Sequence, residues 1–527
     1  MRIPVDALLV SRAVNITGNV TDSTLLLPAS QPPFAEKLDP QIGAFSIEMD
    51  HWRDWAGNVT GQPNTFVNTA LGHLSERTGQ PVYFRVGANS EDRATLDLSV
   101  EIMQAEFPAP TPDVPAPEAD HIAIGRDFYA LSGNLPEGTF FHWGVNLKVL
   151  NDTETEAQLR HLADTFQGSG KDKTKNVKLK LIEIGNEPDF YQGIGTVKAG
   201  WEEWNAANYT VTWARLAKAA TKIFKFDQDT KLAPGAYANF SPQYGSLSWT
   251  PIVSYENNVF VDKTVRKDTG QWSMHMYSGA FSADIPVHVG TLMDKSNIRS
   301  NMSTKASDIK ATRAQGLTYV LAETNSYANH GVPGLSNGGE QVMWAVDTML
   351  HGATMGIARQ HFHNGRGFKY NVLQPIALDG TGVDDGVGRG DRPHVMPLYY
   401  AILIVNEAVG MTGNSYVAEI PTFTNSLSAY AIWENGKLVR AVVVNTDVYT
   451  ADSPARSGIK LALSNLGTTS VTVKRFHTPY TNATNGFTWA GQSFDTETSD
   501  PEGELAEELV AGSVEIEASS VVLLSFK

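Results

Sequence analysis

The stretch Lys180-Leu-Ile-Glu-Ile-Gly-Asn-Glu-Pro-Asp189 decides how the rest of the chain is interpreted. Its apolar residues predict a short buried strand, which Pro188 ends because proline has no backbone N–H to donate. Asn186 and Glu187 therefore follow the carboxyl end of a strand, where barrel enzymes carry their catalytic groups. A second apolar run ends in the same way at Glu323. The sequence thus offers two strand-end glutamates that can face one cavity.

From about residue 40 to 400, short apolar runs alternate with helix-like segments, which predicts repeated βα units. We expect eight strands, at residues 42–47, 82–86, 140–147, 179–184, 231–233, 271–276, 319–322 and 356–362. Helices are expected between them, among them 155–167, 201–225 and 301–315. Eight such units close a barrel, so the fold class is α/β with a (β/α)₈ TIM barrel over residues 30–405.

The texture of the sequence changes after about residue 412 to short alternating strands separated by turn residues, which predicts a β-sandwich. Its strands are expected at residues 416–420, 427–433, 438–445, 459–463, 470–476 and 514–526. Residues 3–14 form a lone strand pattern with no partner in the barrel, so we expect them to join the sandwich. The second domain therefore comprises residues 1–29 and 406–527.

Two insertions interrupt the barrel pattern. The proline-rich segment 107–117 follows the second strand, and we interpret it as a decorated loop, although an interdomain linker would have the same composition. The segment 379–391 follows the eighth strand, and the spacing of its aspartates does not match a calcium-binding EF-hand loop. We also expect no zinc site at His361 and His363. Since phosphate-loop and dinucleotide motifs are missing from the sequence, no metal and no cofactor are expected.

Composition narrows the partners and the location of the protein. A net charge of −16 and a pI near 5.3 argue against nucleic acid. The sequence has no run of 18 apolar residues, so no membrane span is expected, and it has no cysteine for disulfides or thiol chemistry. The N-terminus lacks the apolar segment of a signal peptide, but Asn-x-Ser/Thr sequons recur. The protein is therefore either intracellular or secreted with its leader already removed. The sequons favour secretion, and we expect a monomeric glycoprotein.

The two glutamates suit the hydrolysis of a glycosidic bond, which needs one protonated carboxyl and one carboxylate. If Glu187 ends the fourth strand and Glu323 the seventh, they lie on opposite sides of the barrel mouth and can approach the roughly 5 Å of a retaining pair. Asn186 can bind a sugar 2-hydroxyl, and Arg85 and Tyr277 can hydrogen-bond the nucleophile. Taken singly, each glutamate is equally compatible with a helix-cap partner or a surface ion pair, and Arg85 with an ion pair in the barrel floor.

The combined strand ends resemble those of glycoside hydrolase family 79, the family of β-glucuronidases and heparanase, and the resemblance covers the whole chain. It is carried by the motifs Phe45-Ser-Ile-Glu-Met-Asp50, Phe84-Arg-Val-Gly-Ala-Asn-Ser90, Ile184-Gly-Asn-Glu-Pro-Asp189, His275-Met-Tyr277 and Ala322-Glu-Thr-Asn325. The resemblance implies that Glu187 is the acid/base and Glu323 the nucleophile.

The resemblance also implies a set of substrate-binding residues. Glu48 would bind ring hydroxyls, Tyr277 would support the nucleophile, and Tyr370 would approach the substrate carboxylate. Asn89 belongs to the second of the matching motifs and is also expected to bind substrate. The family's carboxylate-binding loop after the seventh strand has no clean counterpart here, so the candidates there are Tyr327, His330 and Gly331. Arg366 and Lys369 could supply positive charge for the carboxylate instead.

The function that these observations favour is that of an exo-acting retaining β-glucuronidase, which removes terminal β-linked glucuronic acid, with or without a 4-O-methyl group, from glycans or glycoconjugates. A heparanase-like endo-β-glucuronidase is an alternative within the same class. A catalytically silent carbohydrate-binding protein on a glycosidase scaffold is the alternative from another class.

Overall fold

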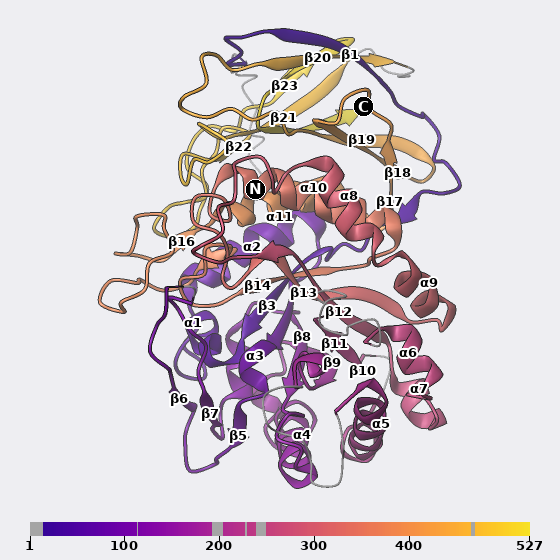
Figure 1. Ribbon diagram of the computed structural model, residues 1–527, viewed down its shortest axis with the longest axis vertical. Helices are drawn as coiled ribbons and strands as arrows, with labels where there is room; N and C mark the ends of the chain where they lie inside the picture. Colours follow the sequence, from indigo (N-terminus) through magenta and orange to yellow (C-terminus); the bar gives the residue numbers. More distant parts are fainter. Residues whose placement is uncertain are drawn as a thin grey trace, which may run out of the picture.

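The computed structural model describes residues 14–112, 114–191, 204–226, 229–238, 249–464 and 470–526. Within them a parallel sheet curls into a barrel, with helices on its outside (Figure 1). In chain order its strands are β3 (Gly43–Glu48), β4 (Tyr83–Gly87), β8 (Phe140–Val145), β9 (Lys178–Ile184), β10 (Lys231–Ala233), β11 (Gly235–Tyr237), β12 (Gln271–Ala280), β13 (Thr318–Ala328) and β14 (Gln360–Asn364). The last strand pairs with the first, Phe362 opposite Phe45. The predicted barrel is confirmed.

The fifth strand of the barrel is divided at Pro234, which cannot donate to a ladder. Its first piece, β10, pairs with β9, and its second piece, β11, pairs with β12. The same stretch of chain therefore joins the two ends of the sheet. The eighth strand begins at Gln360, later than expected, because the preceding helix continues to Met355 and ends at Gly356 in a left-handed conformation.

The helices on the outside of the barrel follow the expected βα order. They are α2 (Thr65–Thr78), α4 (Asp152–Gln167), α5 (Ala206–Ile223), α6 (Pro251–Glu256), α7 (Lys263–Asp268), α8 (Lys295–Ser303), α9 (Ala306–Ala314), α10 (Gly339–Met355) and α11 (Pro397–Val409). The single helix expected at 301–315 is wrong: two helices, α8 and α9, meet there. Ser303 and Thr304 hydrogen-bond back to carbonyls three residues earlier, which competes with helical continuation.

Helices α10 and α11 lie between the barrel and the second domain (Figure 1). Both are buried along nearly their whole length, because one side of each faces the barrel strands and the other faces the sandwich. They connect the two domains through a continuous apolar core. None of the helices in the described part of the chain is both long and apolar enough to span a bilayer.

The C-terminal domain consists of two packed sheets, as predicted. Its strands are β17 (Ser415–Ile420), β18 (Leu427–Glu434), β19 (Lys437–Asn445), β20 (Gly458–Ser464), β21 (Val471–His477), β22 (Thr488–Trp489), β23 (Glu508–Val510), β24 (Ser513–Glu517) and β25 (Ser520–Phe526). The strand expected at 514–526 is in fact two, β24 and β25. They belong to different sheets, and Ser519, at φ +54°, turns the chain from one sheet to the other.

An N-terminal strand does join the sandwich, although it is not the one expected. The strand β1 (Val20–Leu26) pairs in parallel with β20, Asp22 opposite Lys460. Residues 3–13 of the expected strand lie outside the described residues. The short strand β2 (Glu36–Lys37) pairs with β17 in the larger sheet. The domain boundaries at 29/30 and 405/406 stay predictions.

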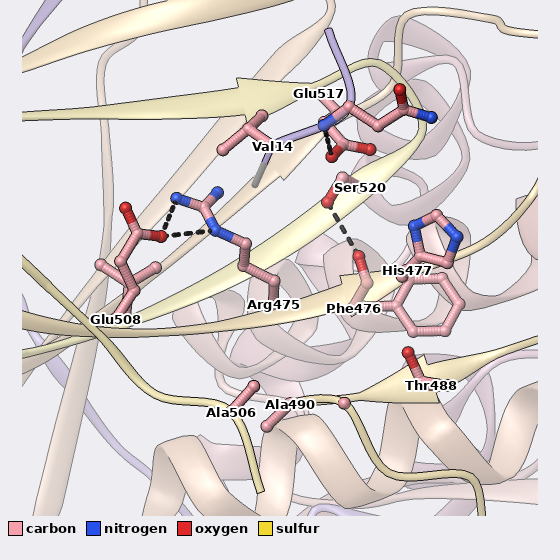
Figure 2. A pocket seen from close by; sticks show the side chains of 13 residues that line it. Val14, Arg475, Phe476, His477, Thr488, Ala490, Ala506, Glu508, Glu517 and Ser520 are labelled. Carbon is pink, nitrogen blue, oxygen red and sulfur yellow. Dashed lines mark hydrogen bonds and ion pairs between the residues drawn. The ribbon is translucent and has the colours of Figure 1, made fainter. Parts of the chain in front are cut away.

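The sandwich encloses a cavity of about 250 Å³ near β21 (Figure 2). Its charged side chains are engaged: Arg475 donates from Nε to Oε2 of Glu508 at 2.9 Å, and Glu517 accepts from the backbone N–H of Asn15 at 2.7 Å. These contacts tie strands of the domain together. The charged groups at this cavity therefore hold the domain together, and the candidate catalytic residues do not line it.

The proline-rich insertion extends the second βα loop. It runs between β6 (Met103–Glu106) and β7 (His121–Ile124), which with β5 (Ala94–Leu96) form a small sheet beside the barrel. After the proline-rich segment the chain returns toward the barrel, where the Ala119 N–H donates to Oδ2 of Asp50 at 2.7 Å. The insertion thus adds a wall to the barrel mouth.

Candidate active site

A cavity of about 480 Å³ lies at the carboxyl ends of the barrel strands. It is lined by Asn89, Val114, Glu118, Glu187, Phe190, Tyr277, Ala280, Glu323, Ala328, Asn329, His330, His363 and Tyr370. Three of these side chains are carboxylic acids and two are imidazoles. Among the described lining residues there is no lysine or arginine. Among the described lining residues, the side-chain donors available to an anionic group of a ligand are therefore hydroxyl groups, amides and imidazoles.

Glu187 and Glu323 come together although they lie on non-adjacent strands. Glu187 follows β9 with a φ of +44°, and its N–H donates to the Ala236 carbonyl at 2.9 Å, which turns the residue inward. The sequence predicted that Glu323 ends its strand. This prediction is wrong, because β13 continues beyond Glu323 to Ala328. Glu323 lies at a register shift of β13, opposite His275 of β12. An oxygen of Glu187 lies within 4.8 Å of an oxygen of Glu323.

Glu323 is held as a carboxylate by its neighbours. The Tyr277 hydroxyl donates to Oε1 at 2.8 Å, and Nη1 of Arg85 donates to Oε2 at 2.9 Å. Burial alone would raise the pKa of Glu323, but the surrounding positive charges, with His363 the largest contribution, lower the pKa to about 2. Glu323 is therefore ionised over the whole physiological range.

Glu187 has the opposite character. Burial and, after it, the negative charge of Glu323 raise the pKa of Glu187 well above its usual range. Its Oε1 lies 2.9 Å from Nδ1 of His275, whose pKa burial lowers to about 3. His275 is thus neutral and adds no positive charge that would ionise Glu187. One carboxyl keeps its proton while the other, close by, has lost it.

Arg85 organises the floor of the cavity and does not line it. It is fully buried, and besides Glu323 it contacts Glu183, from Nε to Oε1 at 2.8 Å, and Asn186, from Nη2 to Oδ1 at 2.7 Å. Because Oδ1 of Asn186 is an acceptor here, its Nδ2 is left to donate; it lies 3.4 Å from Oδ1 of Asn89. Glu183 was missed, although a charged residue inside the apolar strand β9 is itself a signal of a buried ion pair.

The structure separates the expected substrate-binding residues into two groups. Asn89, Tyr277, His330 and Tyr370 line the cavity together with the two glutamates. Those that do not line it are Glu48, Arg85, Asn186, Tyr327 and Gly331, and the cationic candidates Arg366 and Lys369 do not line it either.

Two members of the second group have visible structural duties. Glu48 is fully buried and accepts hydrogen bonds from Ser90. Gly331 has a φ of +88°, and a Cβ there would meet the Tyr370 ring at 3.0 Å, so glycine allows Tyr370 to approach. The binding roles assigned to both groups stay predictions.

Two titratable lining residues were not among the expected site residues. Glu118 comes from the end of the insertion, and its Oε1 accepts from Nε2 of His330 at 2.9 Å. Burial opposes ionisation, but His330 lowers the pKa of Glu118 to about 2. His363 lies on β14, two residues after His361. Glu118 follows no periodic pattern that would have marked it, since its position depends on how the insertion folds back.

The arrangement also bears on metals. Within the described ranges, the group of side chains whose ligand atoms lie close enough to hold a metal ion is Glu187, His275 and Glu323, the acid–base group itself. A protonated carboxyl beside an ionised one suits proton transfer and nucleophilic attack. The same three side chains are therefore arranged for acid–base chemistry of their own.

Comparison with known proteins shows that this chain is similar to glycosidases. Residues 429–523 match the model of the glycosyl hydrolase family 79 C-terminal beta domain. A β-glucuronidase of Aspergillus niger is 26% identical over 513 residues, which cover 92% of this chain and 87% of that protein. A β-glucuronidase of Neurospora crassa is 26% identical over 500 residues, covering 86% and 84%.

The fold has solved counterparts. The structure of a 4-O-α-L-rhamnosyl-β-D-glucuronidase from Fusarium oxysporum superposes with a TM-score of 0.78 at 21% identity, covering 96% of this chain and all of that one. A family 51 α-L-arabinofuranosidase from Bifidobacterium longum superposes with a TM-score of 0.61 at 13% identity, covering 97% of this chain. The barrel and sandwich are thus arranged as in known glycosidases.

Proposed function

We propose that the chain is a member of glycoside hydrolase family 79 and that it is an exo-acting β-glucuronidase that retains the anomeric configuration. The observation that carries the proposal is the pairing of Glu187 with Glu323: their oxygens lie within 4.8 Å, and their pKa values are shifted in opposite directions. Retaining glycosidases hold their two carboxyl groups about 5–5.5 Å apart, whereas inverting enzymes leave room for a water.

In the first step Glu187 protonates the leaving oxygen while the Glu323 carboxylate bonds to the anomeric carbon. Glu187 is suited to this because its raised pKa keeps the proton available. Glu323 is suited because Arg85 and Tyr277 orient both of its oxygens. The product is a glycosyl ester of Glu323.

In the second step Glu187, now a carboxylate, takes a proton from water, and the water oxygen bonds to the anomeric carbon as Glu323 departs. Asn186 supports both steps: Arg85 occupies its Oδ1, so Nδ2 can donate to the sugar 2-hydroxyl as positive charge develops on the ring. The same two residues thus exchange acid and base roles between the steps.

Recognition of the sugar carboxylate is assigned to Tyr370 and its neighbours. Tyr370 lines the cavity beside Tyr277, with ring centroids 6.2 Å apart. Burial raises the pKa of the Tyr370 hydroxyl well above its usual range, so it is a neutral donor. Arginine and lysine are missing from the described lining, so the tyrosine hydroxyls are, with the amide and imidazole N–H groups, the donors that the described lining offers a uronate.

The test is hydrolysis of an aryl β-glucuronide, with NMR detection of the anomer formed first. We expect β-glucuronic acid from the wild type, no turnover from Glu323→Ala, and a similar melting temperature for both. Cleavage of aryl glucosides or xylosides but not glucuronides would refute the uronate specificity, and a first-formed α-anomer would refute retention. Cleavage inside an end-labelled oligosaccharide would refute exo action.

We further propose that the protein is a secreted, monomeric glycoprotein, as its sequons suggest. Asn151 and Asn482 are exposed, and both lie in described segments. Mass spectrometry of protein from a eukaryotic host, with and without glycosidase treatment, tests sequon occupancy. Light scattering tests the monomer.

A further inference from the structure

His363 lies between two carboxylates at the edge of the catalytic cavity. It is 2% exposed. Its Nε2 lies 3.1 Å from Oε1 of Glu48, and its Nδ1 lies 3.8 Å from Oε2 of Glu323. The Ser46 hydroxyl is 3.4 Å from the same Nδ1. The imidazole therefore bridges a buried carboxylate and the nucleophile.

Glu48 is fixed behind this imidazole. Its Oε2 accepts two hydrogen bonds from Ser90, one from the backbone N–H at 3.0 Å and one from the hydroxyl. Its Oε1 is thereby directed to His363 and has no hydrogen bond of its own. Glu48 is fully buried and does not line the cavity. A side chain that binds sugar hydroxyls would instead be expected to line the cavity.

We propose that Glu48 and His363 form a positioning pair that maintains a positive charge beside Glu323 and so accelerates the second step, in which Glu323 leaves the sugar. The inference rests on the retaining mechanism proposed above. In this proposal Glu48 maintains the charge of His363 beside the nucleophile and does not bind ring hydroxyls. His363 thereby gains a role in the reaction.

The physical reason is the change of charge on Glu323. In the first step its carboxylate charge is consumed as the ester forms. In the second step the bond from Glu323 to the anomeric carbon breaks, both electrons stay on Glu323, and the attacking water gives its proton to Glu187. A nearby cation stabilises the departing carboxylate and not the neutral ester. The cation therefore favours breakdown of the glycosyl-enzyme intermediate.

The surroundings of His363 favour its charged form. Burial by itself lowers the pKa of His363, but the charges of Glu323 and Glu48 outweigh it and raise the pKa above its ordinary value. Glu118 of the insertion adds to this. Arg85 of β4 and neutral His275 of β12 stand around the same nucleophile. Removing Glu48 should lower the pKa of His363 and so reduce the fraction of imidazole that is charged.

The test compares His363→Gln and Glu48→Gln with the wild type on an aryl β-glucuronide that has a good leaving group, so that the second step limits turnover. Experiments are run at a pH where Glu323 remains ionised. We expect kcat to fall by about tenfold or more in both variants, the loss of a charge–charge interaction worth about one pKa unit. KM should fall in parallel, with a larger pre-steady-state burst and a glycosylated protein visible by intact mass.

Two further variants keep the test interpretable. Ser90→Ala removes one anchor of Glu48 without removing a buried charge, so a smaller effect of the same kind is expected even if Glu48→Gln folds poorly. Asp385→Asn is the matched control: Asp385 pairs with His394 at 2.7 Å in another buried carboxylate–imidazole pair, outside the cavity lining. Its burst amplitude should equal that of the wild type.

A direct readout is the titration of His363 by NMR of ¹⁵N-histidine protein. An imidazole signal titrating above the ordinary range should be lost in His363→Gln and should titrate at lower pH in Glu48→Gln. Raised KM without a larger burst, or an unshifted imidazole in Glu48→Gln, would overturn the inference while leaving the retaining mechanism intact. An inverted product from the wild type would instead refute the proposed function.

Discussion

Nδ1 of His275 lies 2.9 Å from Oε1 of Glu187, and the environment keeps both groups uncharged near neutrality. Burial lowers the pKa of the histidine to about 3, while burial and the charge of Glu323 raise the pKa of the glutamate. The positive charge of a protonated His275 would instead lower the pKa of Glu187 and favour loss of its proton. The neutrality of the histidine therefore helps Glu187, the proposed general acid, to keep its proton in a cavity that already contains two ionised carboxylates.

The pH dependence of kcat/KM follows from this pair. Activity should fall as pH rises through the raised pKa of Glu187, because the acid loses its proton. On the acid side, activity should persist to low pH, since the pKa of Glu323 is about 2. The measurement is kcat/KM on an aryl glucuronide from about pH 3 to pH 9. A steady increase from acid to alkaline pH would contradict the assignment.

Stability should depend on pH in opposite ways for Glu187 and Glu118. The pKa of Glu118 is depressed in the folded state, so its stabilisation is present above the ordinary carboxyl range and is lost as pH falls toward about 2. The pKa of Glu187 is raised, so its contribution is best at low pH and is lost as pH rises.

Thermal denaturation of two variants tests these signs. Glu187→Gln should raise the melting temperature, relative to wild type, more at pH 7 than at pH 4. Glu118→Gln should lower it at pH 7 and have less effect at acid pH. If both variants shift the melting temperature equally at the two pH values, the pKa directions are wrong.

The hydroxyl of Tyr277 can be removed with little change of shape. Tyr277→Phe deletes the 2.8 Å donor to Glu323 and should lower kcat by about 10- to 100-fold, the loss of one hydrogen bond to a charged group. Tyr255→Phe is the control, because its hydroxyl contacts Thr312 at 3.1 Å, outside the cavity. Similar kinetics for the two variants would argue against a role of Tyr277 in orienting the nucleophile.

Glu183 is expected to act on the reaction through Arg85, without contacting the substrate itself. Glu183→Gln should lower kcat by about tenfold or more with little change in KM, because the guanidinium that orients both Glu323 and Asn186 loses its anchor. A matched ion pair exists elsewhere: Arg299 contacts Glu419 at 2.7 Å near the domain interface.

Glu419→Gln therefore serves as the control for Glu183→Gln. It should lower the melting temperature without lowering kcat of the folded protein. Equal kinetic losses in both variants would mean that general destabilisation, and not the position of Arg85, explains the effect.

Much of the fold could be predicted because its signals are local. The expected barrel strands are short apolar runs followed by polar turns, and each expected run overlaps an observed strand. Local patterns failed where a longer-range or backbone effect intervened, as at Ser303 and Thr304, whose side chains interrupt a helix, and at Ser519, where the chain changes sheets.

The two glutamates were found because each follows or lies within an apolar strand. Glu118 and His363 were not expected in the cavity, and Glu183 was not noticed, because their roles depend on which groups they meet across the barrel. Glu118 meets His330 over a sequence separation of 212 residues. Such contacts have no counterpart in a local sequence pattern.

The sequence by itself determined the barrel, the sandwich and the identity of Glu187 and Glu323 as the paired acids, because hydrophobic periodicity and strand-end positions are properties of neighbouring residues. The family resemblance already implied that Glu187 is the acid, but only the tertiary structure decided why Glu187 keeps its proton while Glu323 loses its own. That choice depends on burial and on the distances to Arg85, His275 and His363, and electrostatic energies of this kind arise only once separate strands are brought within a few ångströms.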